Sequence, residues 1–529
     1  MTGICGLFPK NNYTISEENI EKFTQMIKTL QHRGNQIYIY NGEIFVKIPL
    51  INKNDIKDLA SDFLLGANKY NDCDFLENNY NQPQIISDGI SFPNIIEENS
   101  KFYEKYIISK QLFQYFNQNK TLNFISILKK ILFSFDVRIQ EHTSVVVYGN
   151  NIYLIKDLLG IHPLYICENK KFTAFASERK AFWKNNIHGI IKRLNPGSII
   201  QINGNGPHEI ISKSISDIIK FGLLTPHSLI NKIKTKLISS IKRRFYRIDD
   251  SIGLLYSGGL DSSLLQYYIN DFGYKCKSIL IGMKNSKDII QETNIDNELI
   301  RVEINQENLL NTMSRVLYII ENPDFLTLEI AFCFYHAAKV AKSNNLNRIF
   351  AGQGADELFV GYNKYQRLFR ENHKLYRKQL NYDLDTLSWQ NLEACEMIFT
   401  SFGIKLMYPF LDIDLIKIVR KINPKLLINP NKELNKVILR NIALKEKLPK
   451  DIISKKKHAL QYSTRIHHAL DGYIRSIGFN REFSQELGYG KYYRKLFMDY
   501  LCFELDFPSK LKIQRVEQIK KKINDKLLK

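Results

Sequence analysis

The sequence has no hydrophobic run that could cross a membrane and no cysteine pattern typical of a disulfide or zinc framework. No stretch approaches the roughly 20 apolar residues of a membrane span, and the N-terminus has no basic segment followed by an apolar one, so no secretory signal is expected. The seven cysteines are scattered, odd in number and never spaced as C-x-x-C. These absences favour a reducing, cytoplasmic setting.

Acidic residues are scarce relative to basic ones. The chain has 75 Lys and Arg against 54 Asp and Glu, a formal net charge of +21. Such a charge would suit a nucleic-acid partner, but the basic residues are spread out and gather only in short clusters such as Lys242–Phe245 and Ser454–His458. We therefore interpret the charge as basic faces of a lysine-rich composition, and no nucleic-acid partner is expected.

The sequence has no internal repeat, and its texture changes near the middle. With 529 residues, 44% of them hydrophobic, it is long enough for two to four domains. In the first half, Gln36–Leu50 alternates apolar and polar residues, and Thr143–Glu178 predicts a strand, a Gly-Asn-Asn turn and three further strands. Helices are predicted over Glu17–Leu30 and much of Lys101–Phe116, and a linker over about 205–225.

The second half alternates strands with helices. An apolar strand ends in the glycines of Ser251–Leu260, a helix follows over Asp261–Gly273, and the next strand covers Cys276–Met283. Arg348–Tyr362 contains a third strand with its loop, and the chain beyond it is mainly helical. This order predicts a doubly wound parallel sheet followed by a helical part.

The stretch LLYSGGLDSSLL, Leu254–Leu265, places two glycines between the strand and the helix. The free N–H groups and dipole of a helix start bind anions, and glycine lets an anion approach the backbone. The serines add hydroxyl donors, whereas Asp261 would repel a bare phosphate unless Mg²⁺ lay between them. The spacing is neither G-x-x-x-x-G-K-S/T nor G-x-G-x-x-G, so the loop predicts a phosphate and magnesium site outside both classes.

S-G-G-x-D-S after an apolar strand resembles the pyrophosphate loop of the ATP pyrophosphatases, which cleave ATP to AMP and pyrophosphate. Four later blocks occur in the order of the asparagine synthetase family and resemble its motifs. They are GQGADELFVGY (Gly352–Tyr362), YPFLD (Tyr408–Asp412), KELNKVILR (Lys432–Arg440) and ISKKKHALQYSTRI (Ile453–Ile466). The last block has the K-x-A-x-Q-F/Y form of archaeal members and of the asparagine synthetase domain-containing proteins.

Blocks in the first half resemble the class II glutamine amidotransferase domain of the same family. They are LQHRG (Leu30–Gly34), YLIKDLLGIHPLYI (Tyr153–Ile166), FASERKA (Phe175–Ala181) and NPGS (Asn195–Ser198). The resemblance implies an α/β chain of two domains. Residues 1–210 would form an Ntn-type αββα sandwich, and residues 225–529 a doubly wound parallel-sheet ATP-pyrophosphatase domain with a helical C-terminal part.

The resemblance also implies a reaction: asparagine synthesis from aspartate through β-aspartyl-AMP, with ATP and Mg²⁺ required. Lys457 would neutralise charge on the departing pyrophosphate, and Asp261 and Asp356 would bind the metal. The implied ATP-binding residues are Leu255, Ser257, Gly258, Gly259, Asp261, Ser262, Ile281, Met283, Ala351 and Gly352. The expected partners are aspartate with ammonia or glutamine, and a second copy of the chain in a homodimer; no membrane partner is expected.

The glutaminase half departs from the family pattern. Family members begin M-C-G-I-x-G, and the cysteine at residue 2 is the nucleophile, with its own α-amine as base. Here Thr2 holds that place, and Cys5 is expected to pack in the first strand. The N-G-E expected 40–45 residues past H-R-G is replaced by SDGIS (Ser87–Ser91), while the N-G-E at Asn41–Glu43 predicts a hairpin turn. We therefore expect a weakened or absent glutaminase and a preference for ammonia.

The synthetase half departs as well. Gln353 replaces the first glutamate of G-E-G, Met407 replaces an arginine, and another arginine expected near Glu329 is missing. A free α-carboxylate would want a cation on this acceptor side, so a ligase for another carboxylate and a non-catalytic paralogue remain alternatives. A tRNA-modifying ATP pyrophosphatase would suit the positive charge, but it does not explain the amidotransferase-like half.

Overall fold

A computed structural model of the chain describes most of its residues. The described residues are 2–11, 13–33, 36–40, 45–48, 64–69, 84–91, 123–133, 139–245, 252–284, 286, 298–304, 309–428, 435–455 and 460–527. Contacts divide the chain into two compact units. The first comprises Met1–Arg247, Gln353–Glu393 and Tyr408–Ile438, and the second Ile248–Gly352, Ala394–Met407 and Leu439–Lys529. The units interleave along the chain, and the division expected at 210–225 stays a prediction.

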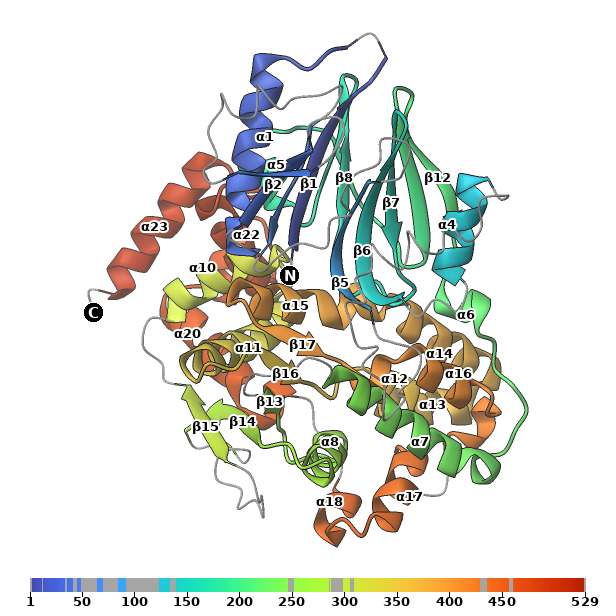
Figure 1. Cartoon of the computed structure of the whole chain (residues 1–529). Coiled ribbons are helices and arrows are strands. Elements are labelled where there is room, and N and C mark those ends of the chain that lie inside the picture. The colour runs from blue at the N-terminus through green and yellow to red at the C-terminus, as the bar shows by residue number, and fades with distance from the viewer. Residues whose placement is uncertain are drawn as a thin grey trace. The chain divides into compact units, whose positions relative to one another are not determined.

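Two antiparallel sheets form the N-terminal part of the first unit (Figure 1). The seven-stranded sheet has the order β10-β8-β9-β1-β4-β2-β3, and the five-stranded sheet the order β12-β11-β7-β6-β5. The bounds are β1 Thr2–Pro9, β2 Gln36–Tyr40, β3 Phe45–Ile48, β4 Leu64–Lys69, β5 Gln84–Ser91, β6 Ile139–Tyr148, β7 Asn151–Lys156, β8 Tyr165–Glu168, β9 Phe172–Ala176, β10 Ile190–Arg193, β11 Ser198–Asn203 and β12 Gly206–Ser212.

The two sheets pack face to face, with a helix on each outer side. In β1, Ile4 and Phe8 face the second sheet, whereas Cys5 and Leu7 face helix α1, Glu17–Thr29. Successive side chains of a strand point to opposite sides, so β1, which is covered on both faces, has apolar side chains on both. Helix α4, Phe124–Phe133, covers the outer face of the five-stranded sheet. These layers match the αββα arrangement that the resemblance implies.

Several sequence expectations for this part are confirmed, and one is wrong. The helix at 17–30 and the hairpin at Gly-Asn-Asn are present, and Tyr148 pairs with Asn151 across that turn. The expected helix over 101–116 lies outside the described residues. The expected linker is structured, because β12 pairs with β11 and α6, Ile215–Ile218, follows it. The glycines and asparagines of this segment form a hairpin turn rather than a spacer.

The rest of the first unit is helical (Figure 1). Its helices are α5 Lys180–Trp183, α7 Pro226–Arg244, α12 Ala355–Leu358, α13 Asn363–Glu371, α14 His373–Leu387 and α16 Ile413–Arg420. Contacts tie these helices to the sandwich at several points. Arg193 Nη2 lies 2.9 Å from Oε1 of Glu393, the last residue of the first-unit segment Gln353–Glu393, and the backbone N–H of Ser216 donates 2.9 Å to Oδ1 of Asp385 in α14.

The second unit contains a parallel five-stranded sheet with the order β15-β14-β13-β16-β17. The bounds are β13 Ile252–Leu255, β14 Cys276–Met283, β15 Leu299–Ile304, β16 Arg348–Phe350 and β17 Lys405–Met407. The chain adds β14 and β15 on one side of β13 and then crosses to add β16 and β17 on the other. The direction of winding therefore reverses at β13, which makes its carboxyl end a topological switch point.

Helices make up the remainder of the second unit. They are α8 Leu260–Asp271, α10 Leu309–Ile320, α11 Phe325–Ser343, α15 Glu393–Ser401, α17 Val437–Lys445, α18 Lys450–Ser454, α19 Leu460–Ser463, α20 Ile466–Ser476, α21 Arg481–Glu486, α22 Tyr493–Glu504 and α23 Ile513–Leu527. The mixed α/β class with a parallel sheet and a helical C-terminal part is confirmed.

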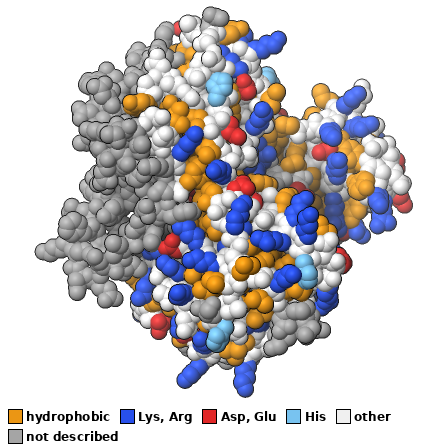
Figure 2. Space-filling view, turned by 90° about the vertical axis from the view of Figure 1, so that its right-hand side faces the viewer, with side chains coloured by type: hydrophobic (Ala, Val, Ile, Leu, Met, Phe, Trp, Pro, Cys, Tyr) orange, Lys and Arg blue, Asp and Glu red, His pale blue; other side chains and the backbone are white. Residues whose placement is uncertain are grey.

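Two global properties bear on the sequence expectations. Among the described residues, no helix combines the length and the apolar character needed to cross a bilayer. Figure 2 shows Lys and Arg side chains spread over the face in view, with apolar and uncharged side chains between them rather than one continuous basic patch. The distribution on this face agrees with the interpretation of the net charge as a general basic character.

Candidate active site

The glycine loop lies between β13 and α8, as the sequence predicts. Gly258 has a φ of 62°, a left-handed conformation that favours glycine, and Gly259 is the N-cap of α8. Ser262 Oγ lies 3.2 Å from the backbone N of Ser257 and 3.3 Å from its hydroxyl. The loop therefore folds back onto the first turn of α8, whose N–H groups have no acceptor within the helix. Such a turn is suited to bind an anion.

A second segment reaches this loop from the other side of the switch point. Ala351 and Gly352 follow β16, and the N–H of the buried Ala351 donates 2.9 Å to the carbonyl oxygen of Met407. A Cβ added to Gly352 would lie 3.3 Å from Asp261 Cβ. Ligands of doubly wound sheets bind at such a point, and the structure brings together two of the segments that the sequence assigned to ATP.

The third segment assigned to ATP is the carboxyl end of β14. Leu255 of β13 pairs with Ile279, two residues before Ile281. Met283 ends the strand, and its N–H donates 3.0 Å to the carbonyl oxygen of Thr464. The lysine block of the sequence is therefore anchored at its C-terminal end to the strand that would hold adenine and ribose.

Arg440, to which the sequence analysis gave no role, binds the other end of the lysine block. Its guanidinium donates to the carbonyl oxygen of Ile453 and, at 3.0 Å, to that of Lys455. Burial lowers the pKa of Arg440, and the negative charge of Asp261 opposes that shift. Arg440 is thus close enough to Asp261 to be affected by its charge. Its position at the end of the K-x-x-L-R block was the available signal.

The expected metal ligands lie in different units. Asp261 belongs to the second unit, whereas Asp356 belongs to the first, where its Oδ1 lies 2.6 Å from Lys436 Nζ. In the part of the chain that the structure describes, no three His, Cys, Asp or Glu side chains converge as a metal site. Mg²⁺ commonly takes one or two carboxylates and completes its shell with water and phosphate oxygens. Asp261, at the glycine loop, therefore fits a metal that arrives with a nucleotide.

Lys457, the expected catalytic cation, lies outside the described residues, as do residues 456, 458 and 459. Its role stays a prediction. The described residues on either side of it, Lys455 and Leu460, are each tied to the fold: Arg440 binds the carbonyl of Lys455, and Thr464 donates from both its N–H, at 3.0 Å, and its hydroxyl, at 2.8 Å, to the carbonyl of Leu460.

The positions where the synthetase half departs from the family are occupied by well-packed side chains. Glu329 is 1% exposed, and its Oε1 lies 2.8 Å from His467 Nδ1. Burial raises the pKa of Glu329, and His467 opposes that rise. Met407 in β17 is also buried. A hydrogen-bonded Glu329–His467 pair and a thioether thus stand at the positions where the family has arginines.

In the N-terminal half, the blocks that resemble an amidotransferase come together around Glu178. His32 Nε2 and Arg33 Nη1 lie 2.8 and 3.1 Å from Glu178 Oε1, and Lys180 pairs with its other oxygen. Burial raises the pKa of Glu178, but the charges of His32, Lys180 and Arg33 outweigh it and hold the pKa well below its usual range. The LQHRG and FASERKA blocks are therefore joined by a buried ionic cluster.

This cluster adjoins the strand that begins with Thr2. A Cβ added to Gly3 would lie 3.0 Å from Leu30 Cβ and 3.3 Å from Arg33 Cβ. The side chain of Thr2 lies outside what the structure describes. Cys5 is fully buried, which raises its thiol pKa, and it packs in the core between the first sheet and α1, as expected. Ser87–Ser91 form the end of β5.

The comparison with protein families gives a match to the part of the chain that contains the glycine loop and the later synthetase motifs. The family described as asparagine synthase matches residues 232–399 and 370–502, which is more than half of the chain. The chain belongs to the asparagine synthase family. The matched segments contain the glycine loop, Gly352, Asp356, Arg440 and Lys457.

Relatives of this family member come from distant organisms. A Methanocaldococcus jannaschii protein named "Putative asparagine synthetase (glutamine-hydrolyzing) 1" is 25% identical over 452 residues, with 80% of each chain covered. Asparagine synthetase B (glutamine-hydrolyzing) of Escherichia coli is 24% identical over 357 residues, 63% of this chain and 62% of that one. Among solved structures, a Bacillus subtilis glutamine phosphoribosylpyrophosphate amidotransferase has 13% identity and a TM-score of 0.28 over 66% of this chain and 80% of its own. That structural likeness is too low to carry an argument.

Proposed function

We propose that this asparagine synthase family member is an ATP-dependent amide-forming ligase that activates a carboxylate as an acyl-adenylate and releases pyrophosphate. The simplest acceptor is aspartate, which would give β-aspartyl-AMP and then asparagine. The approach of Gly352 to Asp261 carries this proposal, because it brings the phosphate loop and the segment assigned to AMP to one switch point.

Each group of residues at the site has a proposed role in the reaction. Ser257, Ser262 and the first-turn N–H groups of α8 would hold the pyrophosphate portion of ATP, and Leu255 with Ile281–Met283 would hold adenine and ribose through the backbone. Asp261, with Asp356 as second candidate, would hold Mg²⁺, which neutralises phosphate charge when bound. Lys457 would neutralise the charge that develops on the leaving pyrophosphate. Arg440 would keep the main chain before Lys457 in place.

Ammonia is the proposed nitrogen source, and residues 1–210 are proposed to be an amidotransferase-like domain that hydrolyses glutamine poorly or not at all. The α-amine and the thiol that this chemistry needs belong to different residues, Thr2 and Cys5. Cys5 is buried in a hydrophobic core, where burial raises its pKa and disfavours the thiolate. A cytoplasmic location and a homodimer are part of the same proposal.

ATP–pyrophosphate exchange tests this function. The purified chain with Mg²⁺ and a panel of carboxylic acids, aspartate first, should exchange labelled pyrophosphate into ATP only when an acceptor acid is present. Asp261→Asn should abolish the exchange, whereas Asp271→Asn, at the other end of α8, should leave it at the wild-type level. Absence of exchange with every acid would contradict the proposal and favour a non-catalytic paralogue.

A second candidate is the same chemistry on a different carboxylate. The buried Glu329 and the buried Met407 support it, because neither side chain is a cation that could bind a free α-carboxylate. Exchange with an acid that lacks this group, and none with aspartate, would decide for this candidate.

A further inference from the structure

Glu141 is an extra residue in strand β6. Gly89 of β5 pairs with His142 and Ile90 pairs with Gln140, so Glu141 bulges out of the register. Its φ of 60° is left-handed, which is costly for a residue with a side chain, and its N–H donates 2.7 Å to Asp157 Oδ2. Bulges re-aim side chains, and this one directs the Glu141 carboxylate to α7.

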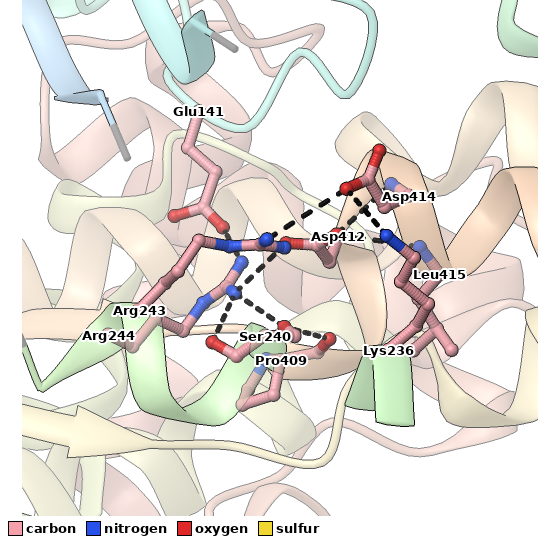
Figure 3. Close-up of polar contacts among 9 residues, drawn as sticks. All are labelled: Glu141, Lys236, Ser240, Arg243, Arg244, Pro409, Asp412, Asp414 and Leu415. Carbon is pink, nitrogen blue, oxygen red and sulfur yellow. Dashed lines mark hydrogen bonds and ion pairs between the residues drawn. The ribbon is translucent and has the colours of Figure 1, made fainter. Parts of the chain in front are cut away.

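The Glu141 carboxylate joins a buried ionic network that includes two arginines of α7 (Figure 3). Arg244 Nη2 pairs closely with Glu141 Oε1, and Arg243 Nη2 pairs closely with Asp412 Oδ2. Arg244 Nη1 also lies 3.6 Å from Asp412 Oδ2. The four side chains are at most 4% exposed. Two cations face two anions in a buried site, so loss of one carboxylate leaves a buried guanidinium poorly compensated.

The network holds both ends of the Y-P-F-L-D turn, Tyr408–Asp412. Asp412 Oδ1 accepts from the N–H of Asp414 at 3.0 Å and caps α16. Ser240 Oγ donates 2.7 Å to the carbonyl oxygen of Pro409, and Arg244 Nη1 donates 2.6 Å to the same hydroxyl. Arg244 therefore contacts the turn through Ser240 and through Asp412, and Glu141 balances its charge from the sandwich side.

The Y-P-F-L-D turn also supports the G-Q-G-A-D-E segment. Gly354, at the N-cap of α12, has a φ of 88°, and a Cβ added there would collide with the side chain of Leu411. The rings of Phe359 and Phe410 pack edge to face with centroids 6.2 Å apart. Asp356 lies between these two contacts, so the placement of its carboxylate depends on the turn.

We propose that Glu141 is a positioning residue of the synthetase, through which the amidotransferase-like half holds the Y-P-F-L-D turn against the G-Q-G-A-D-E segment. The inference deepens the proposed function and rests on it, because these two segments are motifs of the synthetase half. It gives the N-terminal half a role that requires neither a nucleophile at residue 2 nor glutamine. Glu141 touches no substrate in this role and acts through Arg244.

Hydrogen–deuterium exchange of the full chain tests the inference without reference to activity. Glu141→Gln keeps the size of the side chain and removes its charge. Amides of residues 410–416 and 354–359 should exchange at least about tenfold faster, since local opening becomes easier, while those of α8 exchange as in wild type. Glu168→Gln, which breaks the 2.7 Å ion pair with Lys10 elsewhere in the sandwich, is the matched control and should change neither segment.

A double variant separates positioning from charge balance. Glu141→Gln with Arg244→Met removes the guanidinium that would otherwise be left uncompensated, so thermal stability should return toward wild type. The two segments should still exchange faster, because Arg244 no longer holds Ser240 and Asp412. Return of both stability and exchange to wild-type values would overturn the inference, as would equal acceleration throughout the chain in Glu141→Gln.

Kinetics supply the second readout. In ATP–pyrophosphate exchange, Glu141→Gln and the double variant should raise the KM for the acceptor and for ATP with Mg²⁺ about tenfold or more, because the G-Q-G-A-D-E segment contains both Gln353 and Asp356, while kcat changes less than about twofold. A fall in kcat with both KM values unchanged would contradict a positioning role. If wild type exchanges with no acid at all, the proposed function fails, whereas the amide-exchange measurement still decides the role of Glu141.

Discussion

Arg440 Nη2 donates a 3.0 Å hydrogen bond to the main-chain carbonyl of Lys455, two residues before the proposed catalytic lysine. The same guanidinium is affected by the charge of Asp261 in the glycine loop. Arg440 therefore holds the start of the lysine block and lies within electrostatic reach of the glycine loop. Its planar fork can bind two carbonyls at once, which a lysine cannot reproduce.

The first prediction follows from this contact. Arg440→Ala should lower the rate of ATP–pyrophosphate exchange by about 10²-fold, the scale of losing one electrostatic group, and Arg440→Lys should recover only part of it. Steady-state exchange rates at saturating ATP would measure the loss. Arg301→Ala, at an exposed position of β15, should behave as wild type; an equal loss there would show that Arg440 has no special role.

Lys457 is predicted to be the catalytic cation, because it alone has the K-x-A-x-Q register. Lys457→Ala should lower the rate of AMP formation by ~10²–10³, measured by single-turnover release of AMP. Lys455→Ala and Lys456→Ala are the controls and should retain most of the activity, since the backbone carbonyl of Lys455 that Arg440 binds stays in place. A comparable loss of activity in either control would show that Lys457 is not the specific catalytic cation.

Thr2→Cys should restore little glutaminase activity. The substitution joins a thiol to the α-amine at residue 2, but it leaves SDGIS where the family has its glutamine-binding N-G-E. Glutamate release from glutamine should stay far below AMP formation for both wild type and Thr2→Cys. Wild-type release at the rate of AMP formation would make Thr2 an active nucleophile, and strong rescue by the single change would show that the glutamine pocket is intact.

Acid should destabilise the chain partly through His142. Burial, reinforced by the charge of His162, lowers the pKa of His142 from 6.5 to about 3. The unfolded chain therefore takes up this proton first as pH falls, and the folded state loses up to about 1.4 kcal/mol per pH unit between these two values. In thermal unfolding, the Tm of His142→Gln should fall less than the Tm of wild type between pH 7 and pH 5. His188→Gln, at an exposed position, should keep the wild-type slope.

Local sequence patterns predicted the elements near the site well. The strand Cys276–Met283 has the bounds of β14, because an apolar run between turn residues leaves little choice. The glycine loop was predictable because strand, glycine pair and helix follow each other directly along the chain. The segment 205–225 was misjudged, since glycine and asparagine favour a linker and a hairpin turn equally.

Contacts between distant parts of the chain could not be predicted in this way. Glu141 and Arg244 are 103 residues apart, and Arg243 and Asp412 are 169 apart. Nothing in the local pattern of β6 indicates a bulge. Whether a charged side chain of this kind is buried depends on a partner that is distant in the sequence. The ion pair of Lys436 with Asp356 was missed for the same reason, although both residues lie in recognised blocks.

The interleaving of the two contact units has a consequence for synthesis on the ribosome. The first unit is complete only when residues up to Ile438 have been made, well after the sandwich strands have emerged. At ~5–20 residues per second, Arg243 and Arg244 would wait on the order of ten seconds or more for their partner Asp412 to appear. A nascent chain that has not yet reached Ile438 therefore has an incomplete first unit. A separately expressed N-terminal fragment that ends before Arg244 would expose Glu141 to water.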